Sequence, residues 1–427
     1  MTVLGLPGEA LSAVVRQLPD NALAASRQAA LERFLERGFP TTRSEDWKYT
    51  DLSDVAEIGR RWLEGYVESS SLESADERIA EIRASVEAHW IVILNGVPAL
   101  DSSVELPANV TVAALSSNPE LPAHEDALAD LNAALLVDGL HITVHGEGST
   151  ELPLGILCFD VANDRPSITQ TRIVIDVEDG ASARLIEYHA SAGAADHYAN
   201  SIVDIALHPD AALDHVRVQN RGIQHSQTHK TTVRLDERSN LSYAGFDLGG
   251  RLVRNGLDVD LAGEDADADV SGLYVAGSSQ HIDNHVSIDH KVGPARSAQE
   301  FKGILGGNCR CVWNGKALVR EGADGTDAEQ ANHNLLLSDK AEIDAKPELE
   351  IYADEVKCAH GTTVGQLDES ALFYLRSRGL DEQEARNALT HAFGASIVSR
   401  VDNRALSRVL TEAVESRLDA IADEAEE

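Results

Sequence analysis

Short segments of alternating apolar and polar residues, between about residues 139 and 356, constrain the fold more than any other feature. More than ten such runs, including HITVH and LDHVRVQ, follow one another without a helical pattern between them. Gly, Asn, Asp and Ser interrupt them at roughly 8–12-residue spacing, which is typical of an all-β sandwich, barrel or solenoid. The strands are too many for a seven-stranded sandwich, but the runs share no fixed period. A solenoid is therefore permitted by the pattern without being required by it.

Helical patterns flank the strand-rich region on both sides. Apolar residues recur at three- and four-residue spacing within residues 21–37, and two short strands are predicted at 90–94 and 110–113. The chain beyond residue 370 returns to helical spacing. We therefore predict three domains: a mixed, largely helical region (1–136), a β core (137–366) and a C-terminal helical domain (367–427).

One predicted helix of the C-terminal domain carries a single apolar stripe. Asp381 and Glu384 have the spacing of a capping box, in which the Asp replaces the usual Ser or Thr. Leu389, Phe393 and Ile397 follow at four-residue intervals and so share one helix face. Such a stripe must be buried against the β core or against another protein. We predict that these three residues bind a partner.

The acidity of the chain limits its partners. It has 36 basic and 71 acidic residues and a formal charge of −35, which repels phosphate backbones and anionic lipids. No apolar run approaches the ~20 residues that cross a bilayer. The N-terminus lacks the basic region of a secretory signal. We expect a cytoplasmic protein with neither nucleic acid nor membrane among its partners.

Catalytic and metal-binding motifs are sparse. The chain has no Walker A loop, GxGxxG fingerprint, GxSxG elbow or HExxH helix, so any phosphate chemistry must come from a partner. Its four cysteines form no CxxC pair. His225 and His229, like His281 and His285, stand four residues apart on predicted strands. That spacing separates the two side chains by about 13 Å, too far to share one ion on a straight strand.

Cys358 and His360 form the clearest candidate site. They stand two residues apart, after the extended run LEIYADEV and before Gly361, so we place them where a strand ends. Cys and His are common soft-metal ligands, and an accessible thiol beside His and Lys would be partly thiolate. Two ligands are half of a typical iron–sulfur site, so the others would come from elsewhere in the chain or from a partner. The alternative is a structural role for both residues.

Several motifs together resemble one known family. They are TRSEDWKYT (42–50), WNGK (313–316), residues 332–337 with AEID (341–344), KCAHGTTVG (357–365) and FYLRSRG (373–379). In this order, spanning nearly the whole chain, they are similar to the SufB/SufD family of SUF iron–sulfur cluster assembly scaffolds. The Cys-x-His-Gly block favours the SufD branch. Thr362 stands where the family more often has Ala, and Ala345 where Thr is common; neither position is a candidate ligand.

The resemblance implies a mainly β fold, with a right-handed parallel β-helix between helical ends. It implies a scaffold that pairs with a SufB-like subunit through the β-helices and binds a SufC-like ATPase through the C-terminal helices. A transient Fe–S cluster would form at the SufB–SufD interface and be shared with SufB, with His360 as the matching ligand and Cys358 as the second candidate. A reduced flavin is associated with the whole complex, although this chain has no flavin motif.

Two other function classes are open from the sequence. A β-helix polysaccharide lyase or hydrolase would act in a groove of Asp, Arg or Lys, but such enzymes are usually exported and this chain is poor in Lys. A homo-oligomeric binding protein is the other class, because a solenoid with open edges can pair with a second copy. The isolated chain would then be a homodimer. Co-purification with a SufC-like ATPase separates these classes from the scaffold.

Overall fold

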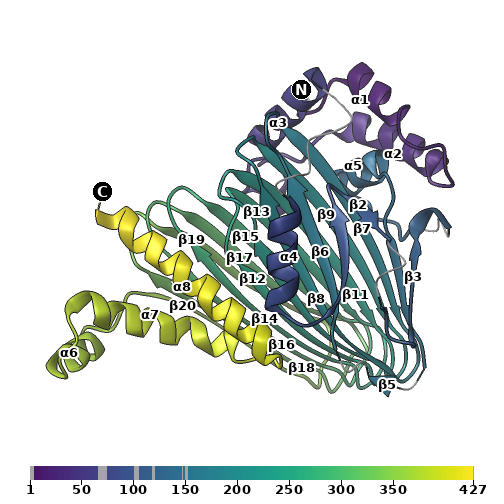
Figure 1. The fold of residues 1–427 in the computed structure, drawn as a ribbon. Coiled ribbons are helices and arrows are strands. Elements are labelled where there is room, and N and C mark those ends of the chain that lie inside the picture. Colours follow the sequence, from purple (N-terminus) through teal and green to yellow (C-terminus); the bar gives the residue numbers. More distant parts are fainter. Residues whose placement is uncertain are drawn as a thin grey trace.

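The strand-rich region folds into a parallel β-solenoid, which confirms the predicted mainly β class with helices at both ends (Figure 1). The computed structural model describes residues 4–65, 75–100, 105–117, 121–146, 148–149 and 152–426. No helix within these ranges is long and apolar enough to cross a membrane.

The solenoid consists of two sheets, which the chain visits alternately from β6 onward. Sheet A contains, in spatial order, β2 (Val97–Ala99), β1 (His89–Leu94), β6 (Leu154–Val161), β8 (Ala181–Ala192), β10 (Ala212–Asn220), β12 (Asn240–Asp247), β14 (Asp267–Ala276), β16 (Arg296–Leu305), β18 (Asp327–Leu336) and β20 (Lys357–Gly365), and β5 (Gly148–Ser149) also pairs with β8. Sheet B contains β19 (Glu342–Ile351), β17 (Arg310–Val319), β15 (His281–His290), β13 (Leu252–Leu261), β11 (His225–Leu235), β9 (His197–Leu207), β7 (Ser167–Val177), β4 (Leu140–Val144) and β3 (Val110–Ala114).

The length of one solenoid turn varies along the chain. Ser226 pairs with Leu252, 26 residues later, whereas Arg310 pairs with Glu342, 32 residues later. The strands stay in parallel register because the turns between them absorb the difference. This variation explains why the sequence has no fixed repeat although the fold is a solenoid.

The interior between the sheets has an apolar half and a polar half. Strand side chains alternate in direction, so every second residue points inward. Sheet B strands end on inward apolar residues, such as Val203 and Leu207 of β9, which join one large hydrophobic cluster. The opposite half, where sheet A strands end, holds buried charged and imidazole groups instead. We call this group the polar tract: Asp160, Glu187, His189, His197, His215, Arg217, Arg221, His229 and Asp247.

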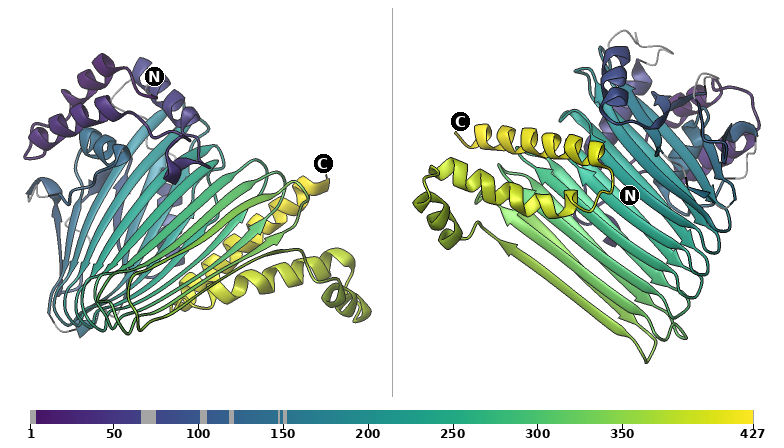
Figure 2. Two further views of the ribbon diagram at one scale, coloured as in Figure 1. Left: turned by 180° about the vertical axis from the view of Figure 1, so that it is seen from behind. Right: turned by 60° about the horizontal axis from the view of Figure 1, so that its bottom comes forward.

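Helices cover the outer faces of both sheets. Those of the N-terminal region are α1 (Gly8–Val15), α2 (Ala24–Arg37), α3 (Ser53–Glu64), α4 (Ala75–Ser85) and α5 (Ala127–Leu135), with short 3₁₀ turns at Glu45–Trp47 and Leu115–Ser117. Those of the tail are α6 (Glu369–Ser377), α7 (Glu382–Val398) and α8 (Arg404–Glu426). Helices α3 and α5 pack on sheet B, whereas α4, α7 and α8 pack on sheet A (Figures 1 and 2).

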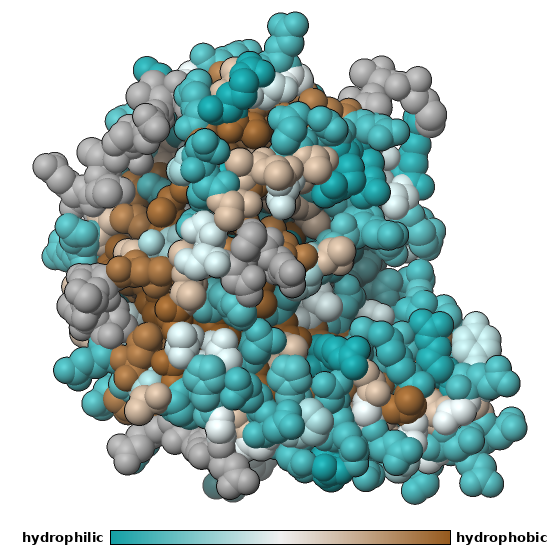
Figure 3. All heavy atoms as spheres, turned by 90° about the vertical axis from the view of Figure 1, so that its right-hand side faces the viewer, coloured by the Kyte–Doolittle hydropathy of each residue, from teal (hydrophilic) through white to brown (hydrophobic). Residues whose placement is uncertain are grey.

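The N-terminal region is continuous with the solenoid. β1 pairs in parallel with β6, and β3 pairs antiparallel with β4, although β1 and β3 precede residue 137. The domain limits at residues 137 and 366 stay predictions, since the sheets run across the first of them. In Figure 3, which faces the side that carries β3 and α5, hydrophobic residues gather mainly left of centre, whereas hydrophilic residues predominate on the right and below.

Candidate functional site

The solenoid ends in an uncovered rung, formed by β19 and β20. Among the strands that the structure describes, each of these two has a neighbour on one side only, β17 and β18 respectively. Inward-facing residues that would be buried in an inner rung are therefore open to solvent. Val364 is 51 % exposed, whereas its register partner Asn334 on β18 is 3 % exposed. We call this surface the open end.

Cys358 and His360 both lie on the open end. They occupy inward-facing positions of β20, opposite Ala328 and Gln330 of β18. His360 is exposed and Cys358 is half-buried. Our placement of the pair at the end of a strand was wrong, because β20 continues to Gly365 and Gly361 lies within it. Alternation along the strand keeps both side chains on the same face, so the structure brings the predicted pair together.

The thiol of Cys358 differs from our expectation. Partial burial, reinforced by the nearby carboxylate of Asp327, raises its pKa above the ordinary thiol value. The predicted partial thiolate was therefore wrong for the chain on its own, because desolvation outweighs any effect of the neighbouring Lys and His. The thiol can still become a ligand if a metal displaces its proton.

A buried glutamine, Gln330, lies beneath the open end. It lies directly beneath His360 in the register and is 4 % exposed. Neither its amide oxygen nor its amide nitrogen has a hydrogen-bond partner in the described part of the chain. Buried amides are normally hydrogen-bonded, so this one is available to a group that arrives from outside.

Apolar residues surround these polar ones. Ile351, the last residue of β19, and Tyr352, which follows the strand, are 40 % and 63 % exposed, and Val364 adds a third exposed hydrophobic side chain from β20. The backbone groups along the outer edges of both strands lack a neighbouring strand among the described residues. Edges of this kind pair readily with strands of another chain.

The stripe predicted to bind a partner faces mostly inward. The capping box is confirmed: Asp381 Oδ1 accepts from the Glu384 amide and Glu384 Oε2 from the Asp381 amide, both at 2.8 Å. Ile397, however, is fully buried in the cluster that α7 and α8 form with sheet A. Phe393 packs beside it, half-buried, with the Lys302 ammonium 4.9 Å from its ring centroid.

The exposed apolar side chains of the tail lie on the preceding helix. Phe373 and Tyr374 of α6 are 74 % and 56 % exposed. Figure 2 shows α6 and part of α7 projecting away from the sheets, whereas α8 lies along sheet A. Ile397 is therefore a contact within this chain, and α6 offers the freer surface.

Comparisons with known proteins match this architecture over nearly the whole chain. A family model for the SufBD core domain of SUF-system FeS cluster assembly matches residues 159–393, and a model for the SufBD N-terminal region matches residues 9–156. The chain belongs to the SufB/SufD family. The iron–sulfur cluster assembly protein SufD of Escherichia coli is 29% identical over 402 residues, covering 92% of each chain. A SufBD family iron–sulfur cluster assembly protein of Synechocystis is 30% identical, covering 95% of this chain and 93% of its own. SufD of Bacillus subtilis is 26% identical, covering 69% and 67%.

This family assignment replaces the alternative of a polysaccharide lyase or hydrolase. The chain is an iron–sulfur cluster assembly protein of the SufBD type, as the resemblance predicted.

One motif that carried the resemblance, residues 42–50, lies against the outer face of sheet B. Trp47 stacks on the Arg254 guanidinium, 4.8 Å from the ring centroid, and Thr50 donates to Asp283. The motif therefore attaches the N-terminal region to the middle of the solenoid.

Sequence reasoning missed a second constellation in this SufB/SufD family chain, inside the polar tract. Glu187, His189 and His229 have ligand atoms within 4.8 Å of one another. Their carboxylate and ring atoms come from β8 and β11, which belong to different sheets and face each other across the interior. The separation we assigned to His225 and His229 holds along one strand, but it ignored partners from the opposite sheet. Glu187-x-His189, with same-face spacing on one strand, was the signal that could have found the group.

Burial sets the protonation of this group. Desolvation lowers the pKa of His189, and lowers that of His229 well below the ordinary imidazole value. Burial alone would raise the pKa of Glu187, but His229 and hydrogen bonds from His189 and His215 lower it instead. Burial therefore favours the neutral form of both imidazoles, whereas the surrounding histidines favour the ionised form of Glu187.

Proposed function

We propose that this chain is a non-catalytic scaffold subunit for iron–sulfur cluster assembly that pairs with a SufB-like subunit through the open end. One observation carries the proposal: the last rung leaves inward-facing residues, His360 among them, uncovered. Beneath His360 lies the buried amide of Gln330, which has no hydrogen-bond partner in the ranges that the structure describes. A solenoid gains stability when each rung is covered by the next. A second solenoid supplies such a covering rung.

The edge strands suit strand-to-strand pairing with that partner. Strand pairing to β19 and β20 would extend both sheets into the partner, and main-chain hydrogen bonds would supply much of the affinity. Ile351, Tyr352 and Val364 would lose their solvent exposure at the same interface. The acidic composition of the chain does not oppose this pairing, because apolar side chains dominate the inward face of the open end.

The nascent Fe–S cluster is the cargo of this interface. The His360 imidazole is exposed on the inward face and is the first candidate ligand, and Cys358 is the second. Two ligands leave half of a typical cluster unligated, so the SufB-like partner would share the cluster and supply the rest. Since the Cys358 thiol is protonated in the free chain, its metal binding would release a proton.

A SufC-like ATPase would dock on the tail. The exposed pair Phe373 and Tyr374 is our preferred anchor, with the half-buried Leu389 and Phe393 beside it. Exposed aromatic side chains are frequent anchors of protein interfaces. Deleting the tail is a poor test, because α7 and α8 cover Leu273 and Ile304 of sheet A. Replacing Phe373 and Tyr374 by Ser should abolish ATPase binding without unfolding the core, and retained binding would place the dock elsewhere.

The experiment for the whole proposal is reconstitution with SufB-like and SufC-like subunits. His360→Ala should leave complex assembly intact and lower the cluster absorbance sharply. Its free energy of unfolding should change by about 0.5–1 kcal/mol at most, as expected for an exposed residue. Thr363→Ala is the matched control, since Thr363 lies on the same strand and faces outward, against His333. Normal cluster yield from His360→Ala would refute the ligand role.

Two further expectations belong to the same complex. A reduced flavin would be seen as bound flavin absorbance in the purified complex, and cytoplasmic location by fractionation of cells. The open end would also accept a second copy of this chain, because the unpaired edge of a strand can form hydrogen bonds with the same edge of another copy. Light scattering of the isolated chain tests this homodimer. A dimer that dissociates when the SufB-like partner is added would mean that both use the open end.

A further inference from the structure

We propose that Glu187, His189 and His229 form a binding site for one divalent transition-metal ion inside the solenoid. The Glu187 carboxylate lies 2.7 Å from His189 Nε2 and 3.7 Å from His229 Nδ1, both measured from Oε1. The three side chains are at most 3 % exposed. One carboxylate and two imidazoles that converge in a closed pocket are a common donor set for such ions.

The charges of the polar tract leave Glu187 without a cation. Arg221 lies 2.5 Å from Asp160, and Arg217 lies 2.8 Å from Asp247, so these four charges pair off. The ion pairs of Glu187 in the described part of the chain are all with histidines. A buried carboxylate without a counter-charge is costly, and a bound cation removes that cost.

The ring of His229 supplies a second, independent observation. Its Nε2 lies 2.9 Å from the Thr231 hydroxyl, whereas its Nδ1 has no hydrogen-bond partner among the described residues. When Nε2–H donates to Thr231, the Nδ1 lone pair points toward the Glu187 oxygen. Two acceptors that face each other at 3.7 Å attract a cation between them.

Neighbouring groups already orient the ligands. His215 Nε2 lies 3.0 Å from Glu187 Oε2 and so holds the carboxylate by its other oxygen. Arg221 keeps its bonds to Asp160 and Gln227, at 2.5 and 2.8 Å, and makes only a 3.5 Å contact with His189 Nδ1. Without an ion, His189 Nε2 donates to Glu187, so binding a metal through Nε2 requires the ring proton to move to Nδ1, on the side away from the carboxylate. Such partners around the ligands raise metal affinity.

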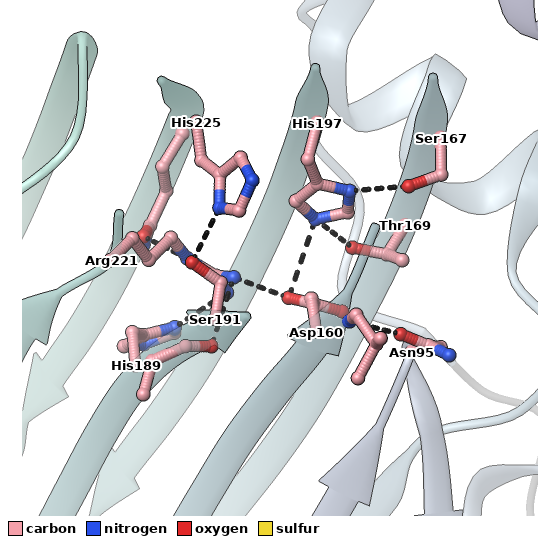
Figure 4. Close-up of polar contacts among 12 residues, drawn as sticks. Asn95, Asp160, Ser167, Thr169, His189, Ser191, His197, Arg221 and His225 are labelled. Atoms are coloured by element: carbon pink, nitrogen blue, oxygen red, sulfur yellow. Dashed lines mark hydrogen bonds and ion pairs between the residues drawn. The ribbon is translucent and has the colours of Figure 1, made fainter. Parts of the chain in front are cut away.

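A network of polar contacts links the site with residues near the surface (Figure 4). The Ser167 hydroxyl, on the wall of a surface cavity of about 870 Å³, lies 2.8 Å from His197 Nδ1. His197 Nε2 lies 3.5 Å from Asp160, which pairs with Arg221, and Arg221 reaches His189. The buried group is therefore continuous with polar side chains and not with the apolar half of the interior.

The test is metal binding by the full chain without partners. After chelator treatment, anaerobic titration with Fe²⁺ or Zn²⁺ should show one tightly bound ion per chain, whereas Mg²⁺, which prefers oxygen ligands, should not compete. Glu187→Gln and His229→Gln should lose this ion. His215→Gln, which removes only a supporting hydrogen bond, should weaken affinity about 10–100-fold. His290→Gln changes a buried histidine of β15 outside the group and should bind like the native chain.

His360→Ala separates this inference from the proposed function. It should keep the ion, because His360 lies at the open end, so a failed cluster assay and a failed metal titration remain distinguishable. If the buried variants do not fold, the visible absorption spectrum of Co²⁺ bound to the native chain still shows how the ion is coordinated. Intense visible bands of a low-coordinate site would support the inference. A pale, water-rich octahedral spectrum, no tight ion in the native chain, or equal binding by folded Glu187→Gln would overturn it.

Discussion

The two ends of the solenoid follow the same inward and outward alternation but are finished differently. At the N-terminal end each sheet terminates in an antiparallel strand, β2 or β3, and helices pack nearby. Ile142 of β4 is fully buried there. At the other end β19 and β20 stop in parallel register, and Val364 is half exposed in an inward-facing position. The comparison teaches that an inward-facing position belongs to the core when another strand or helix covers its rung. The same position is open to a partner when no such element follows.

The largest expected effect is a matched pair of charge insertions at the two ends. Ile142→Asp buries an unpaired carboxylate and should cost at least about 4 kcal/mol or prevent folding. Val364→Asp places the same group at the open end and should change the free energy of unfolding by about 0.5 kcal/mol or less. Urea unfolding followed by circular dichroism measures both. Similar costs at the two ends would mean that the open end is covered in the isolated chain, as in a homodimer.

The Val364→Asp variant also tests pairing. Its charge would face the covering rung of a SufB-like partner, so complex formation should be lost while the monomer stays folded. An outward change on the same strand, Thr363→Asp, should weaken pairing much less. Binding that both variants retain would move the interface away from the open end.

Acid should separate interior histidines from exposed ones. Burial lowers the pKa of His290 from 6.5 to about 4, so the unfolded chain takes up a proton that the folded chain refuses. Stability should therefore fall as pH drops from about 6.5 to 4, by about 3 kcal/mol for this residue, since one pKa unit is worth about 1.4 kcal/mol. His290→Gln should flatten that part of the pH profile, and His360→Gln, the exposed counterpart, should not. If His290→Gln leaves the dependence of stability on pH unchanged, the lowered pKa of His290 is not the cause of the acid destabilisation.

The smallest expected effect is a difference in thiol labelling. Cys358 is half-buried, whereas Cys158, Cys309 and Cys311 are buried. An alkylating reagent should label one thiol of the folded chain, slowly at neutral pH because the Cys358 pKa is raised, and all four after unfolding. Mass spectrometry counts the labels. Adding the SufB-like partner should protect Cys358, and undiminished labelling in the complex would place that thiol outside the interface.

The sequence predicted local features well where local chemistry decides them. The spacing of Asp381 and Glu384 predicted a capping box that both hydrogen bonds confirm. Sequence reasoning failed where a side chain packs against, or interacts with, a residue of a different strand or helix. Ile397 fits a docking stripe by periodicity, yet sheet A already covers it. His229 looked isolated on its strand, because the strand that brings Glu187 to it is about forty residues earlier in the chain.

By itself, the sequence determined the mainly β class, the helical ends, the family and the Cys358–His360 pair, since alternation, capping and motifs are written in neighbouring residues. Only the tertiary structure decided that the pair lies on an uncovered rung and that the Cys358 thiol holds its proton. It also brought a carboxylate and two imidazoles together inside the solenoid. Burial and charge pairing depend on which strands stack and face each other, and that depends on turn lengths that no local pattern encodes.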